Sequence, residues 1–169
     1  MRDNCHGPEW IYADDVDVSA VLADVPLAEW PAAGPRPRKR HPLDILCAFD
    51  IETSPVPGLE DQAAVYHWQM QLGFNFPTIY GRELAEARRL LDRLADAIPN
   101  GAQLVIYAHN LYYEFAFMRG VYPGISGKDV FAVKPRHVVR WDTYAGRIVW
   151  KCSYILCNMG LNLFTHSLN

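Results

Sequence analysis

The chain has 169 residues, half of them hydrophobic and 21% charged, which suits one globular domain with a modest core. Its net charge of −3 gives no overall attraction to nucleic acid, so any such binding must depend on local groups. No apolar run reaches the length of a membrane span and the N-terminus lacks an apolar signal core, so we expect a cytoplasmic protein without membrane contact.

Residues 1–42 differ from the rest of the chain. Aspartates are scattered among valines and alanines there, and no hydrophobic period is sustained. The stretch from Pro31 to Pro42 is rich in proline and arginine, which predicts a linker, either simply solvated or acting as an arm that contacts phosphate. We therefore interpret 1–42 as an N-terminal extension with a linker, and 43–169 as the folded domain.

The first predicted strand, 45–49, is apolar on both faces and ends in two carboxylates, Asp50 and Glu52. Because side chains alternate along a strand, both carboxylates lie on one face. Such a pair repels unless a positive charge lies between its members, and Mg²⁺ prefers oxygen ligands. A solvated strand end would carry the same residues, so this alternative stays open. The turn-forming residues from Thr53 to Gly58 predict that the strand is broken there.

Two further strands, 63–72 and 76–80, are predicted to complete an antiparallel meander. In the first of them the more apolar alternating set, which includes Trp68, should face the core. Leucines and alanines at spacings of three and four predict a helix over 84–98, and a buried strand over 104–107 follows it. This order of elements indicates an α/β protein.

The sequence from His109 to Phe115 predicts a helix that begins directly after this buried strand. Asn110 is a plausible N-cap, and it shares one helix face with Tyr113 and Glu114. Open α/β sheets bind ligands at the carboxyl ends of their strands. Each residue also has a plainer explanation, namely capping for Asn110, packing for Tyr113 and a solvated first-turn acid for Glu114.

The stretch 49–53 followed by 107–115 resembles the first two exonuclease motifs of family B DNA polymerases, and the protein-primed phage and organelle-plasmid type is most similar. The later stretch 152–161 is similar as well, so the resemblance covers about 43–169. It implies a 3′–5′ proofreading exonuclease domain of ribonuclease H-like fold, an α/β fold whose mixed sheet is flanked by helices.

The same resemblance implies roles for individual residues. Asp50, Glu52 and Glu114 would be the catalytic carboxylates and would ligate two Mg²⁺ or Mn²⁺ ions, although Glu114 stands where the family usually has an aspartate. Two such ions can drive the hydrolysis of a phosphodiester. The residues that would contact the 3′ end of single-stranded DNA are Thr53, His109, Asn110, Tyr113 and Ser153.

One part of the family pattern is missing. The third exonuclease motif, a tyrosine three residues ahead of an aspartate, should lie beyond Leu161 and does not occur before Asn169, and the polymerase domain is absent. We therefore expect a fold that is incomplete at the C-terminus, in an N-terminal polymerase fragment such as a truncated reading frame, a split gene product or an excised domain. The missing polymerase portion or a priming terminal protein would then be a partner.

Two alternatives remain open at this stage. A stand-alone exonuclease of the same superfamily would need a fourth carboxylate from Asp129 or Asp142, which we otherwise interpret as surface residues. A non-catalytic module that binds single-stranded DNA or a partner would need none. The remaining predicted elements are a hairpin over 130–141, a strand over 147–156 and a helix over 160–168.

Overall fold

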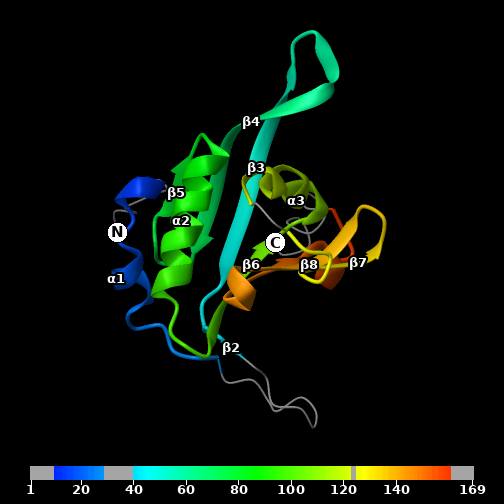
Figure 1. The fold of residues 1–169 in the computed structure, drawn as a ribbon. Helices are drawn as coiled ribbons and strands as arrows, with labels where there is room; N and C mark the ends of the chain where they lie inside the picture. The colour runs from blue at the N-terminus through cyan, green and yellow to red at the C-terminus, as the bar shows by residue number, and fades with distance from the viewer. Residues whose placement is uncertain (1–9, 29–39, 123–124, 161–169) are drawn as a thin grey trace, which may run out of the picture.

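The computed structural model describes residues 10–28, 40–122 and 125–160. Most of the predicted proline-rich linker and of the helix over 160–168 lie outside these ranges. The described residues form an α/β fold with one nine-stranded sheet (Figure 1). The strand order is β1-β5-β4-β3-β6-β9-β8-β7, and β2 pairs with β6 beside this path.

The predicted meander is confirmed. Strands β3 (Cys47–Val56), β4 (Leu59–Leu72) and β5 (Thr78–Gly81) pair antiparallel in turn. The predicted break after Thr53 is wrong, because β3 continues through Pro55, which pairs with Ala63. Strand β6 pairs with β3 only at Cys47 and Ala48. Within the described ranges the far part of β3 therefore pairs with β4 alone, and Pro55 interrupts no second ladder. Figure 1 shows this hairpin extending beyond the helices.

Helix α2 (Leu84–Ala97) connects the meander to β6 (Ala102–Ala108), as the leucine spacing predicted. Helix α3 (Tyr112–Met118) and a 3-10 turn, η2 (Arg119–Val121), follow β6. Strand β6 runs parallel to β3, and β9 runs parallel to β6. The remaining elements are β7 (Val130–Lys134), β8 (His137–Thr143), η3 (Tyr144–Gly146), β9 (Ile148–Cys152) and α4 (Tyr154–Cys157).

The predicted hairpin over 130–141 and the predicted strand over 147–156 have different outcomes. The hairpin is confirmed, because β7 pairs antiparallel with β8. The strand over 147–156 is too long by five residues, since β9 begins at Ile148 and ends at Cys152, and a short helical turn, α4, follows.

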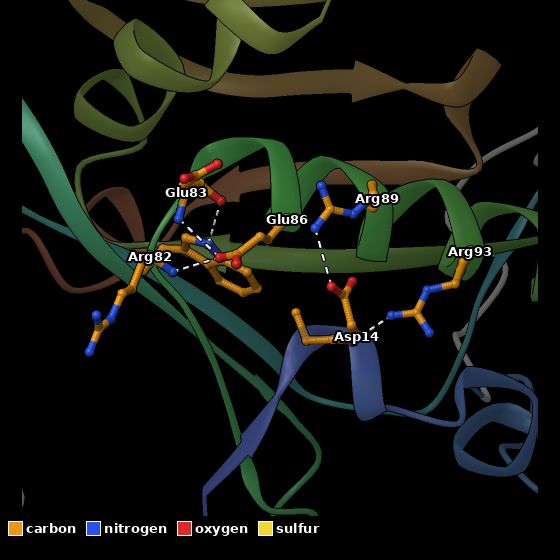
Figure 2. A network of polar contacts seen from close by, with 8 residues as sticks. Asp14, Arg82, Glu83, Glu86, Arg89 and Arg93 are labelled. Atoms are coloured by element: carbon orange, nitrogen blue, oxygen red, sulfur yellow. Dashed lines mark hydrogen bonds and ion pairs between the residues drawn. The ribbon is translucent and has the colours of Figure 1, made fainter.

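The described N-terminal residues join the same sheet. Strand β1 (Trp10–Tyr12) pairs parallel with β5, and β2 (His41–Pro42) pairs parallel with β6. Between them lie η1 (Ala13–Asp15) and α1 (Val18–Leu22), whose apolar side chains are buried in the common core. Two arginines of α2 hold this segment, as Figure 2 shows: Arg89 pairs with Asp14 at 3.2 Å, and Arg93 donates to the carbonyls of Ala13 and Val16.

The two faces of the sheet differ in composition. Helices α2 and α3 lie on one face (Figure 1), where Phe49, Trp68 and Met70 are buried. The predicted alternation along β3 and β4 is therefore confirmed at these positions. Asp50 and its cross-strand partner Gln69 belong to the opposite face and are only half-buried. None of the helices within the described ranges is long and apolar enough to cross a membrane.

Candidate active site

Asp50 and Glu52 lie on β3, and each has a defined partner across the hairpin. Asp50 is half-buried and pairs with Gln69, whose amide Nε2 lies 3.5 Å from Asp50 Oδ2. Glu52 is exposed and pairs with His67. Directly paired residues of an antiparallel ladder project to the same face, so all four side chains belong to one surface.

Glu114 lies in the first turn of α3 and has a relative exposure of only 2%. The interpretation of Glu114 as a solvated acid is therefore wrong. Burial, together with a smaller effect of the negative charge of Asp50, raises the pKa of Glu114 to about 8. Its Oε2 atom is buried without a hydrogen-bond partner among the described residues. The negative charge of Asp50 on β3 thus acts on Glu114 of α3, which lies 64 positions later in the chain.

Thr53 and Tyr113 connect the same two elements. The hydroxyl oxygens of Thr53 and Tyr113 lie 2.5 Å apart and share a hydrogen bond. The Tyr113 ring is 39% exposed and packs edge-on against Phe117, with 5.3 Å between the ring centroids. The bond fixes the end of an aromatic ring that stays accessible to a ligand.

His109 and Ser153 lie at the carboxyl ends of β6 and β9, two neighbouring parallel strands. His109 Nδ1 is 3.2 Å from Ser153 Oγ, and the Ser153 amide donates to the Ala108 carbonyl at 3.0 Å. The other ring nitrogen of His109, Nε2, is buried and makes no hydrogen bond in the described part of the chain.

The prediction of Asn110 as the N-cap of α3 is wrong. Leu111 occupies that position, and Asn110 is exposed with a φ of 62°, in the left-handed region that asparagine tolerates better than most residues. Its carbonyl accepts a hydrogen bond from the Tyr113 amide at 2.8 Å. Asn110 lines a small pocket of about 370 Å³ together with His109.

Asp50, His109 and Ser153 line a common groove of about 750 Å³. Gln69 and Gln71 of β4 also line it. Within the described ranges, no group of three or more His, Cys, Asp or Glu side chains is arranged to hold a metal ion. The groove therefore runs along Asp50 of β3 and the histidine–serine pair at the carboxyl ends of β6 and β9.

Asp129 and Asp142 lie elsewhere. Arg140 donates to both carboxylate oxygens of Asp142, at 2.6 and 2.9 Å, and Asp129 accepts from the Ser126 amide at 3.0 Å. Both aspartates line a separate pocket of about 130 Å³. Since β8 is the third strand from β3, Asp142 is at least about 14 Å from the Asp50 strand. The structure thus gives no support to a fourth carboxylate from these two residues.

Sequence reasoning missed the contribution of β4. Gln69 contacts Asp50, and His67 lies opposite Glu52, because of the register of the β3–β4 hairpin. The alternation of β4 placed both residues away from the core, but only the turn position determines which strand residues face each other.

Comparisons of the chain with protein-family models, with curated proteins and with solved structures found no match.

Proposed function

We propose that this chain is a metal-dependent exonuclease domain that removes nucleotides from the 3′ end of single-stranded DNA, of the kind found in family B DNA polymerases. The observation that carries the proposal is the burial of Glu114, which has one unsatisfied carboxylate oxygen and whose pKa is raised by burial and by the negative charge of Asp50. Two carboxyl groups that interact, one of them buried, favour a proton or a cation between them.

The topology supports a ribonuclease H-like fold as part of this proposal. Strands β5, β4 and β3 form an antiparallel meander at one side of the sheet, and β6 and β9 continue it in parallel. Helices α2 and α3 make the connections into and out of β6. The expected ribonuclease H-like sheet is mixed in this way, with helices following its parallel part.

The donor atoms fit Mg²⁺ or Mn²⁺ in kind. Asp50 and Glu114 would hold the cation with hard oxygen atoms, and the unsatisfied Glu114 Oε2 offers one of them. Glu52, on the same face of β3, is the third carboxylate of the proposed set. A bound cation would supply Lewis-acid stabilisation of the charge that develops on a phosphodiester.

The residues around the carboxylates would position the DNA strand. The exposed Tyr113 ring, fixed through its hydroxyl by Thr53, offers a face on which a terminal base stacks. His109 and Ser153 line the groove and present polar groups suited to a sugar or phosphate oxygen. Asn110, exposed beside His109, would add an amide to these contacts.

Release of nucleotides from 3′-labelled single-stranded DNA in Mg²⁺ or Mn²⁺ tests the proposal. We expect Asp50→Asn and Glu114→Gln to abolish a release that the wild-type chain shows. Asp142→Asn is the matched control, because Asp142 is paired with Arg140 in another pocket and its loss should leave release unchanged. Loss of release in Asp142→Asn would instead favour the stand-alone enzyme with a different set of carboxylates.

A thermal shift gives a second readout that does not depend on activity. Mg²⁺ or Mn²⁺ should raise the Tm of the wild-type chain, since a ligand that binds only the folded state stabilises it, and should raise it less in Asp50→Asn. A chain that binds single-stranded DNA but shows neither metal-dependent release nor a metal-dependent shift would be the non-catalytic binding module, and the exonuclease proposal would fail.

A further inference from the structure

An aromatic cleft lies on the sheet face that carries Asp50 and Gln69, at the β1 edge of the sheet. Four rings surround a cavity of about 490 Å³: Trp10 and Tyr12 of β1, Tyr80 of β5 and His67 of β4. Their centroids are about 6 Å apart, with Tyr80 at the centre, 6.1 Å from Trp10, 5.9 Å from Tyr12 and 5.8 Å from His67. The ring planes are inclined by 44–88°, so the rings do not cover one another.

Packing alone does not account for this cluster. Cross-strand aromatic pairs stabilise a sheet edge, which explains why Trp10 and Tyr12 touch Tyr80. Such pairing does not explain why the two side chains remain exposed, Trp10 by 54% and Tyr12 by 64%. Contiguous exposed aromatic surface is uncommon on soluble domains and marks binding sites.

Strand register aligns the cleft with the candidate active site. Tyr12 pairs with Tyr80, Tyr80 pairs with Gln69, and Gln69 pairs with Asp50. Residues paired in this way lie on the same face, so one row crosses four adjacent strands from β1 to β3. Its ends are three strand spacings, or about 14 Å, apart. A ligand that reaches both ends must be extended.

A cationic group, Arg82, contacts the cleft. The exposed guanidinium of Arg82 donates from Nε to the Tyr80 hydroxyl at 3.1 Å. Figure 2 shows this side chain pointing away from the polar network at the start of α2. Among the described residues its two terminal nitrogens make no hydrogen bond or ion pair. It is placed to pair with an anion next to the rings.

We propose that the cleft of Trp10, Tyr12, His67 and Tyr80 binds unpaired nucleotides, whose bases stack on the rings while a phosphate pairs with Arg82. Aromatic rings bind single strands without sequence preference in this way, and a nearby guanidinium complements the phosphate charge. The inference rests on the proposed function, because it assigns the cleft to the same strand whose 3′ end lies at Asp50. The cleft holds nucleotides upstream of that end.

Fluorescence anisotropy of a labelled dT12 oligonucleotide in EDTA measures binding without cleavage. Tyr12→Ala and Trp10→Ala should each weaken binding about 5- to 100-fold, the range expected for the loss of one base–aromatic stack. Tyr12→Phe, which keeps the ring, should bind like the wild-type chain. Phe131→Ala is the matched control, because Phe131 is 59% exposed on β7, at the opposite edge of the sheet. Arg82→Gln should weaken binding and reduce its dependence on salt.

Several results would overturn the inference. It fails if folded Tyr12→Ala and Trp10→Ala both bind dT12 like the wild-type chain, if the wild-type chain does not bind dT12, or if the cleft variants lose binding of a proline-rich peptide instead. Its failure is separable from that of the exonuclease. Metal-dependent release with unaffected cleft variants rejects only the cleft, and ring-dependent binding without release rejects only the exonuclease.

The length of the DNA provides a further readout. A dinucleotide is too short to reach from Asp50 to the cleft, so Tyr12→Ala and the wild-type chain should release nucleotides from it at equal rates. A rate difference should appear only with longer strands and should lie in KM. A Tyr12→Ala defect that is equal for the dinucleotide and for dT12 would show a general structural effect and would contradict the proposed site.

Discussion

Glu114 has a carboxyl group that folding removes almost completely from water. Its pKa of about 8 in the folded chain lies above the ordinary value of 4.5, so the folded state binds this proton more tightly than the unfolded state. The resulting stabilisation is fully present below pH 4.5 and is lost as the pH rises through 8. Without divalent cations, we expect the free energy of unfolding in urea to fall over this interval, by on the order of 3–5 kcal/mol at most.

Glu114→Gln is the control for this prediction, because an amide of nearly the same shape stays neutral at every pH. Its free energy of unfolding should change much less with pH between 4.5 and 8 than that of the wild-type chain. Equal slopes in the two proteins would mean that another group causes the pH dependence and would contradict the burial of an ionisable Glu114.

At the level of single residues, local patterns predicted only part of the candidate site. Alternation along β3 was enough to place Asp50 and Glu52 on one face, away from Phe49. The burial of Glu114 depends on how α3 packs, which no local pattern encodes. The N-cap prediction for Asn110 was wrong because Asn110 adopts a left-handed conformation in the turn between β6 and α3, a conformation that asparagine tolerates.

Strands β4 and β5 meet at a glycine that the packing requires. A Cβ atom on Gly81 would come within 2.5 Å of the Trp68 ring. The ring cannot move easily, because it is fully buried and its Nε1 donates to the Glu83 carbonyl at 2.9 Å. We expect Gly81→Ala to lower the free energy of unfolding by about 1–3 kcal/mol, the usual cost of overpacking a core. Denaturation in urea measures this change.

Gly120→Ala is the matched control, since no atom of the described residues lies within 4 Å of the Cβ it would add. Its free energy of unfolding should stay within about 0.5 kcal/mol of the wild-type value. If both variants lost the same stability, the cause would lie in glycine replacement itself and not in the contact with Trp68.

Elements with a sustained period were predicted well, and elements set by distant pairing were not. The spacing of leucines gave α2 to within one residue at its C-terminal end. The extension of β3 through Pro55 was missed because it depends on which strand lies beside it. Strand β1, with three residues, is too short to show any period, and its partner β5 lies more than sixty positions away.

For the whole molecule, the main difference from the sequence interpretation concerns the N-terminal segment. Residues predicted to be an extension supply an edge strand and four core side chains, namely Ala13, Val16, Val18 and Leu22. Two of the aspartates that made this segment look irregular have structural roles, because Asp14 pairs with Arg89 and Asp17 caps α1. The sheet and the aromatic cleft both depend on these residues.

Leu22→Ala tests whether this segment shares one cooperative core with the sheet. Leu22 is 4% exposed and belongs to the same buried cluster as Trp68 and Leu90, so truncation should leave a cavity and cost about 2–5 kcal/mol. Leu27→Ala, at a side chain that is 51% exposed, should cost less than about 1 kcal/mol. Both are measured from urea denaturation followed by tryptophan fluorescence, which reports on the buried rings of the sheet.

If the segment were an independent extension, Leu22→Ala would leave the main transition in place, because the sheet would unfold independently of α1. A single transition at lower urea in Leu22→Ala, and not in Leu27→Ala, is the result expected of one core.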